Sequence, residues 1–273
     1  MLEFMKNKDE ISREMVHDKK MKIIILRLDY IGVTDLIALI SAFESVFSGS
    51  FSMRQEVYNN QLNVSLRAED LNSISESLSV PVNVIRKEKL WRYSGLKDVM
   101  CKTSLDISQY YLCLTIMCED NYDGLDIYMP YFERTVKAFK DNNRYFRPKR
   151  LGLRKNRVEK FEEYDNIAST FEKSVFCMDN FFSCCEKHIV KNYIDVVRNT
   201  CSNDLQVNIN RKIEPVVIDD KEIYKTALDI DAYYQSEEIL NSLPIDQLLS
   251  NANNYEFEIY KSCMTQKYLN QIM

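Results

Sequence analysis

Residues 23–28 read Ile23-Ile24-Ile25-Leu26-Arg27-Leu28, and residues 150–154 read Arg150-Leu151-Gly152-Leu153-Arg154. The first stretch is rich in β-branched side chains, which favour a strand. In the second stretch two leucines alternate with polar or small residues, and this alternation predicts a strand that is covered on one face. Each stretch opens one half of the chain, and together they decide the predicted fold.

The same order of patterns follows each stretch. In the first half, Thr34-Asp35 is a helix N-cap signal, and apolar residues then recur at helical spacing up to Phe47. A meander of strands comes next, in which Asn59-Asn60 predicts a hairpin turn. The half ends on an amphipathic helix around Tyr128–Lys140. Its other expected elements are a short helix at Glu69–Leu78 and strands at Val82–Ser94, Met100–Ile107 and Tyr110–Cys118.

The second half repeats this plan. Its closing helix is expected around Asp246–Leu269, and its meander at His188–Val197, Leu205–Val217 and Glu222–Tyr234. We therefore predict an α+β fold, built as a tandem duplicated unit of strand, helix, antiparallel meander and helix. Residues 1–20 form a charged N-terminal arm, residues 21–146 the first repeat and residues 147–273 the second.

Helices that return to one side of an antiparallel sheet bury its apolar face and leave the other face open. Two such units placed edge to edge would form one continuous twisted sheet with helices on one face. This arrangement resembles the TATA-binding-protein and helix-grip architectures. A likeness in topology implies nothing about function.

Composition favours a folded, cytoplasmic protein. The chain has 273 residues, 45% hydrophobic content and a formal net charge of −5. No apolar stretch approaches the ~20 residues needed to span a bilayer, and residues 1–10 lack the apolar core of a signal peptide. We therefore expect no membrane association. The acidic balance argues against broad binding to duplex nucleic acid, because neutralisation of phosphates dominates that affinity.

Eight cysteines and two histidines limit the metal and nucleophilic chemistry that the chain can support. Without a secretion signal, cysteines in a chain of this length are expected to be reduced thiols. The one suggestive group is Cys177, Cys184, Cys185 and His188, whose spacing could seed a zinc site. A second ligand pair at the usual spacing is missing, so we expect no structural zinc and no cofactor.

The densest basic run lies at the start of the second repeat. It consists of Arg147, Lys149, Arg150, Arg154, Lys155 and Arg157. Guanidinium groups at strand spacing can grip a phosphate or a carboxylate, and Gly152 would let a ligand or another backbone approach closely. The alternative is a solvated strand edge whose charges prevent aggregation. The candidate ligand-binding residues of this run are Arg150, Gly152, Arg154 and Arg157.

Asp229 and Asp231 complete the candidate site. They project from the same face of an expected strand, ~7 Å apart. Paired carboxylates can hold Mg²⁺ or act as acid and base, but a metal nuclease would add a third acid and a positioned Lys or His, and neither is present at a suitable spacing. The alternative is a polar pair that forms ion pairs with the arginine strand.

The Arg150–Arg154 stretch also carries a family resemblance. The chain resembles a sporadically distributed, uncharacterised bacterial protein family with an R-(I/L)-G-L-R-Y-(I/V)-N signature near mid-chain. Three further features fit: an aromatic helix with Tyr128, Tyr131 and Phe132, the strand Leu228–Asp231, and a closing helical segment with Phe257. After Arg154 this chain has Lys155-Asn156-Arg157, where the family places Tyr-Ile-Asn. The resemblance implies a shared fold and mobile genes of the kind enriched in bacterial defence islands, and it carries no established activity.

Three functions remain open. The favoured one is a non-catalytic binding or interaction protein, such as a sensor or accessory subunit of a defence module, with a protein partner or a second copy of itself. Its basis is the missing catalytic constellation, because the chain has few histidines and no Gly-rich phosphate loop. The second is a nucleic-acid-binding protein that uses the open sheet face. The third is a metal-dependent hydrolase built around Asp229 and Asp231.

Overall fold

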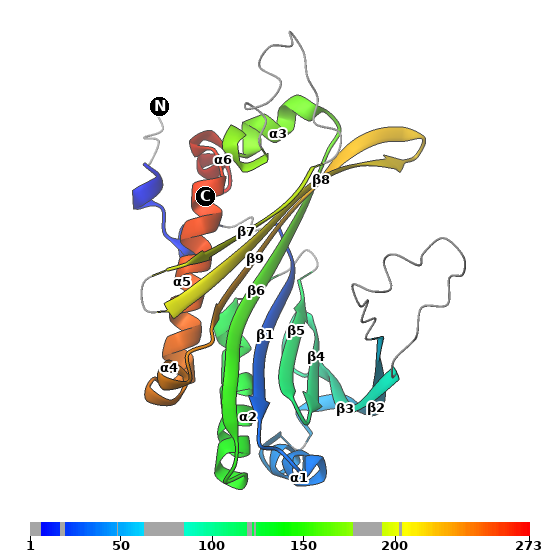
Figure 1. Ribbon diagram of the computed structural model, residues 1–273. Coiled ribbons are helices and arrows are strands. Elements are labelled where there is room, and N and C mark those ends of the chain that lie inside the picture. The colour runs from blue at the N-terminus through cyan, green and yellow to red at the C-terminus, as the bar shows by residue number, and fades with distance from the viewer. Residues whose placement is uncertain are drawn as a thin grey trace, which may run out of the picture.

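In the computed structural model, one antiparallel sheet of nine strands runs through the molecule, as the ribbon in Figure 1 shows. The structure describes residues 7–16, 20–47, 49–62, 85–118, 122, 124–176, 193–201 and 204–273. The α+β class and the joining of both halves in a single sheet are confirmed.

The first half supplies five strands and two α-helices: β1 (Met21–Ile31), α1 (Leu36–Phe47), β2 (Phe51–Leu62), β3 (Ile85–Leu96), β4 (Lys102–Ser108), β5 (Tyr111–Met117) and α2 (Met129–Asn142). The second half supplies β6 (Arg147–Phe161), α3 (Tyr164–Thr170), β7 (Tyr193–Thr200), β8 (Leu205–Ile218), β9 (Lys221–Tyr234), α4 (Glu237–Ser242), α5 (Ile245–Cys263) and α6 (Gln266–Gln271). Short 3-10 turns are η1 (Lys8–Glu10), η2 (Arg13–Met15), η4 (Leu125–Ile127) and η5 (Lys173–Phe176). Within the described part of the chain, no helix combines the length and the apolar character needed to cross a membrane.

The strands are ordered β2-β3-β4-β5-β1-β6-β9-β8-β7 across the sheet. The strands that join the two halves are β1 and β6, which pair antiparallel with Leu26 opposite Leu153. Each half begins on one of these strands. The meander of each half starts at an outer edge of the sheet and ends beside that first strand, so that β5 pairs with β1 and β9 pairs with β6. The first meander has four strands, and the second has three among the described residues.

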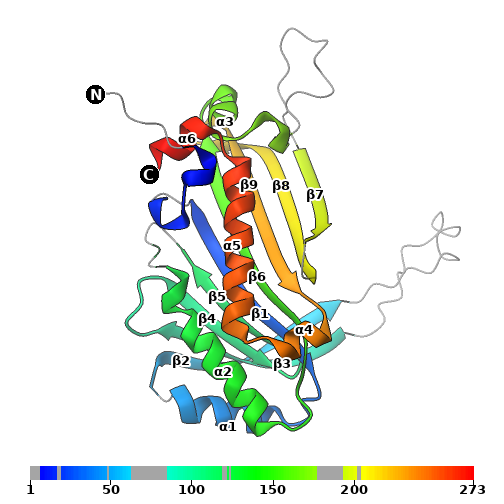
Figure 2. The same ribbon diagram turned by 90° about the vertical axis from the view of Figure 1, so that its left-hand side faces the viewer.

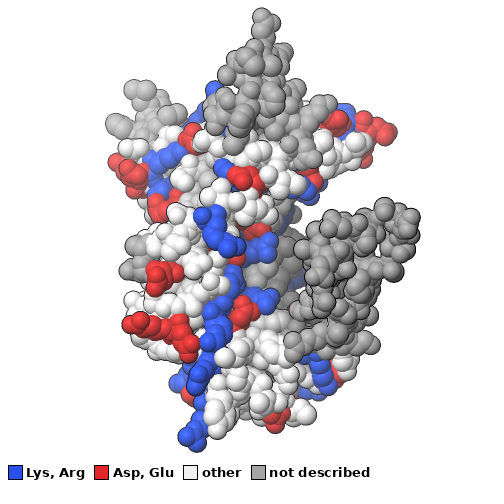
Figure 3. Space-filling model, in the orientation of Figure 1, with Lys and Arg blue, Asp and Glu red and all other residues white. Residues whose placement is uncertain are grey.

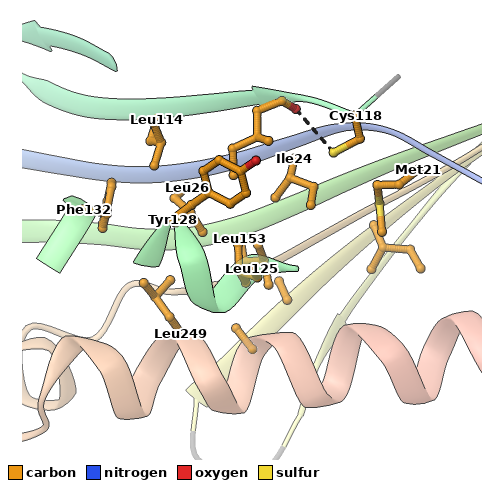
Figure 4. Packing of buried hydrophobic residues seen from close by; sticks show 14 of the residues in the cluster. Met21, Ile24, Leu26, Leu114, Cys118, Leu125, Tyr128, Phe132, Leu153 and Leu249 are labelled. Carbon is orange, nitrogen blue, oxygen red and sulfur yellow. Dashed lines mark hydrogen bonds between the residues drawn. The ribbon is translucent and has the colours of Figure 1, made fainter. Parts of the chain in front are cut away.

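One face of the sheet carries the hydrophobic core. Along β1, the side chains of Ile24, Leu26 and Leu28 are buried, while alternate residues are partly exposed. This period of two follows from the pleat, which sends successive side chains to opposite faces. Figure 2 shows α1, α2 and α5 lying across the covered face. In the close-up of Figure 4, Phe132 of α2 and Leu249 of α5 lie close to the strand residues of this core.

One predicted turn is wrong. β2 continues through Asn59-Asn60, which pair with Glu88 and Lys87 of β3. Pairing with a neighbouring strand overrides the local turn preference of asparagine, because strand formation depends strongly on its context. The predicted helix at Glu69–Leu78 lies outside the described residues. The group of Cys177, Cys184, Cys185 and His188, at which no structural zinc is expected, also lies outside them.

Candidate functional site

The face of β6 opposite the helices carries most of the predicted site residues. Arg150, Gly152 and Arg154 project there, because they alternate with the buried side chains of Leu151 and Leu153 on the covered face. The side chain of Arg150 is 21% exposed and that of Arg154 is 50% exposed. In Figure 3, Lys and Arg side chains gather in a column where Figure 1 places β6, with acidic side chains between them.

Arg150 is held in place by three neighbours. Its Nη2 donates to both carboxylate oxygens of Asp231, at 2.8 and 2.7 Å. Its guanidinium carbon lies 4.3 Å from the ring centroid of Tyr233, within cation–π range. Its Nη1 lies 3.9 Å from a carboxylate oxygen of Asp29 on the other side of β6. The side chain therefore bridges strands from both halves of the chain.

Gly152 provides the space in which Arg150 lies. A Cβ atom at this position would be 3.1 Å from Nη1 of Arg150 and 3.1 Å from Cβ of Tyr233. The sequence predicts that a ligand or another backbone comes close to this glycine. In the structure, the guanidinium of Arg150 and the Cβ atom of Tyr233 are the groups that lie close to it.

Arg154 pairs with the second predicted carboxylate. Its Nε donates to the two oxygens of Asp229, at 2.8 and 3.1 Å. The side chain of Asp229 is only 8% exposed, so the guanidinium supplies donors that water cannot. The hydrogen bonds and negative charge of Asp229 raise the pKa of Arg154 above its ordinary value. Asp229 and Asp231 therefore both form ion pairs with arginines of β6, which is the alternative arrangement considered for this acid pair.

The first half adds two similar pairs, whose residues are not among the predicted site residues. Arg92 donates to both oxygens of Asp106 at 2.7 Å, and Arg27 donates to Asp29 at 2.7 Å. The guanidinium of Arg27 also lies 4.3 Å from the ring centroid of Tyr111. The sequence contains a sign of these pairs. Arg27 interrupts the apolar run of β1 at a position whose side chain points to the open face of the sheet. We call the four pairs, Arg92–Asp106, Arg27–Asp29, Arg150–Asp231 and Arg154–Asp229, the paired belt.

The paired belt carries four positive and four negative charges, so it is electrically neutral. Each of its guanidinium groups already binds a carboxylate, and this does not suit a surface that must neutralise a row of phosphates. Asp229 and Asp231 are likewise engaged by arginines. Among the described residues, no group of three or more His, Cys, Asp or Glu side chains could hold a metal ion.

Arg157 lies on the other face of the sheet, which corrects its place in the predicted site. Arg157 and Lys155 point to the same face of β6 as Leu151 and Leu153, because all four are alternate residues of the strand. The side chains of Arg157 and Lys155 are buried beneath α5. There Arg157 forms an ion pair with Glu256 and stacks on Tyr260 at 4.0 Å from the ring centroid. Period-two alternation within β6 is the signal that could have separated Arg157 from Arg150 and Arg154.

A second exposed surface lies along β7, at one end of the sheet. Ile194, Val196 and Val197 are 65%, 61% and 41% exposed. Val196 pairs with Asn210, which in turn pairs with Asp229, so Val196 lies on the same face as the paired belt. Among the described residues, β7 pairs with β8 alone, which makes it an edge strand.

Comparison with known proteins identifies no family for this chain. No family model and no curated protein matches it. The solved structures with weak similarity include two from biosynthetic loci or pathways. DynU16, from the dynemicin biosynthetic locus, shares 7% identity over 90% of this chain and 97% of its own, with a TM-score of 0.19. The di-domain ARO/CYC protein StfQ, from the steffimycin biosynthetic pathway, shares 6% identity over 91% of this chain and 98% of its own, also with a TM-score of 0.19. Similarity at this level supports no statement about the function of this chain.

Proposed function

We propose that this protein is a non-catalytic interaction protein that extends its sheet by strand addition at β7. The observation that carries the proposal is the exposure of Ile194 and Val196, at 65% and 61%, along an edge strand. An edge strand presents unpaired backbone donors and acceptors, and aliphatic side chains beside them favour pairing with another strand.

The opposite end of the sheet makes the contrast clear. The edge strand β2 is protected by charge, because Arg54 forms an ion pair with Glu44 and Glu56 lies 2.8 Å from Lys89. Charged side chains are a common means of preventing edge-to-edge association. β7 also has an ion pair, between Asp195 and Arg211, but it exposes the aliphatic side chains of Ile194, Val196 and Val197, whereas the exposed apolar side chains of β2 are Met53 and Tyr58. The β7 edge is therefore the more aliphatic of the two.

The partner that we propose is a second copy of the chain. β7 carries one acid, Asp195, and one base, Arg198. Two antiparallel copies therefore bring no net charge together, and a two-fold axis would bury the same patch on both subunits. The neutral paired belt weakens the alternative of nucleic-acid binding. Engagement of Asp229 and Asp231 by arginines weakens the alternative of a metal-dependent hydrolase.

We also propose that the two halves, residues 21–146 and 147–273, are copies of one strand–helix–meander–helix unit, arranged as in TATA-binding-protein or helix-grip architectures. The support is the shared order of elements around the β1–β6 pair. Membership of the bacterial family with the R-(I/L)-G-L-R signature is part of the same proposal. In that setting the protein would be a cytoplasmic sensor or accessory subunit of a defence module.

The test is the mass of the protein in solution, measured by sedimentation velocity over a range of concentrations. We expect the wild-type chain to dimerise and Val196→Lys to be monomeric, because the two new charges would lie close together across the two-fold axis and repel each other. Met53→Lys, at a 50% exposed position of β2, is the matched control and should still dimerise. A monomeric wild-type chain, or a Val196→Lys chain that dimerises equally well, contradicts the proposal.

A further inference from the structure

A small cavity lies on the helix-covered side of the sheet, away from β7 and from the paired belt. Its volume is about 120 Å³. Lys155 and Arg157 of β6 line it, together with Asn253 and Tyr260 of α5 and Arg13 of the N-terminal segment. Because a site for a single water molecule needs about 10–15 Å³ by a probe-based measure, the cavity has room for several.

The cavity wall holds two buried cations against one buried carboxylate. Nζ of Lys155 lies 2.8 Å from Glu256 and donates to Asn253 at 2.6 Å. Arg157 binds the other carboxylate oxygen of Glu256. The side chains of Lys155, Arg157 and Glu256 are 3%, 4% and 0% exposed, so the cluster lies inside the protein and carries an excess of one positive charge.

Among the described residues, the acids at the cavity do not offset this charge. Glu14 also lines it, but the Glu14 side chain is 73% exposed, and Asp126 is exposed as well. Their charges are therefore screened by solvent. A buried ion without a partner is strongly unfavourable, so a protein normally pairs it or binds a counter-ion.

Hydrogen bonding points the same way. Nε of the buried Arg157 side chain has no hydrogen-bond partner among the described residues. A buried guanidinium N–H without an acceptor destabilises the folded state, and an anionic oxygen is the strongest acceptor for it. Burial lowers the pKa of Lys155 to about 8, which reflects the unfavourable desolvation of a second cation beside Arg157.

We propose that this cavity binds a small oxyanion, the carboxylate or phosphate group of a ligand, against Arg157 and Lys155. The bound group neutralises the excess charge and accepts the hydrogen bond that Nε of Arg157 offers. Arg13, on the N-terminal segment, adds a third cation to the same cavity. The site thus requires residues from both ends of the chain, since Arg13 precedes β1 and Asn253 lies on α5.

The experiment is a titration with sodium phosphate and, separately, with sodium acetate, at an ionic strength held constant with sodium chloride. Thermal unfolding and the ¹⁵N resonance of Arg157 Nε are followed in the full-length protein. We expect a saturable rise in Tm and a saturable shift of this resonance. A response to phosphate alone assigns a phosphate group, and a response to acetate alone assigns a carboxylate.

Three variants make the test specific. Arg157→Met removes the excess charge but leaves the Lys155–Glu256 pair, so it should fold and weaken anion binding at least about tenfold. Glu256→Gln removes the competing carboxylate and should tighten binding severalfold, which gives a second test with the opposite sign. Arg154→Met, on the open face, is the control and should bind as the wild type does. Absence of any saturable response, or an equal response in Arg157→Met, overturns the proposal.

Discussion

The pair formed by Arg154 and Asp229 predicts an asymmetric effect of mutation. The Asp229 side chain is 8% exposed and the Arg154 side chain 50% exposed. Arg154→Ala leaves a nearly buried carboxylate without its donor, and we expect a loss of about 2 kcal/mol in the free energy of unfolding. This lies below the cost of breaking a fully buried pair, because water already reaches half of the arginine.

Removing both partners should be less harmful than removing the arginine alone. The double variant Arg154→Ala/Asp229→Ala no longer buries an unpaired charge, so its loss should be about 1 kcal/mol. Arg198→Ala is a matched control, because among the described residues that exposed arginine on the same sheet face donates to the neutral side chain of Asn208, at 2.9 Å, and to no carboxylate. Its loss should be under about 0.5 kcal/mol.

The assay is urea unfolding at pH 7, followed by far-ultraviolet circular dichroism. The expected order of midpoints places Arg198→Ala nearest the wild type, then the double variant, then Arg154→Ala. A double variant that is less stable than Arg154→Ala would refute the reasoning, since Asp229 would then stabilise the sheet without its guanidinium. Unchanged stability of Arg154→Ala would show that the pair contributes nothing, and would favour a binding role for the arginine.

Three further predictions concern the same sheet and its core. Gly152→Ala should lower stability by about 1 kcal/mol, since overpacking against Arg150 and Tyr233 outweighs the smaller gain in chain rigidity, and urea midpoints measure it. Lys155 has a folded-state pKa of about 8, below the ordinary value of 10.5, so between these values the unfolded chain binds the proton and the folded chain does not. Stability of the wild type relative to Lys155→Met should therefore rise with pH over this window, and a falling difference would contradict the burial of Lys155. Cys263, whose pKa burial raises to about 11, should resist iodoacetamide at pH 8 until urea is added, as mass spectrometry of the labelled peptide can check.

The strands were predictable where the sequence alternates cleanly. Leu151 and Leu153 on one face, with Arg150 and Arg154 on the other, are positions that period-two patterning assigns correctly. The ion pairing of Asp229 and Asp231 with the arginine strand was an explicit alternative, and it is the arrangement observed. These features follow from local spacing, so they are visible in a single chain.

Other features depend on partners far away in the sequence. The burial of Arg157 requires Glu256, which is 99 positions later, to arrive from α5. Glu256 stands on the apolar stripe of that helix, one turn after Ala252, and an acid at such a position is the signal that a buried cation lies opposite. The turn predicted at Asn59-Asn60 is wrong for a similar reason. Its pairing partners in β3 are about 30 positions away, and a local turn rule does not include them.

The antiparallel pair of β1 and β6 has a consequence for how the chain is made. β1 leaves the ribosome well before β6, which begins only at Arg147. Until then one edge of β1 has no strand beside it, and the nascent chain carries an open, aliphatic edge at the middle of the future sheet. Such an edge is prone to pair with other chains, and long-range closure of this kind slows folding. The growing polypeptide should therefore depend on chaperones during this interval, and a stop codon before Arg147 should yield an insoluble product.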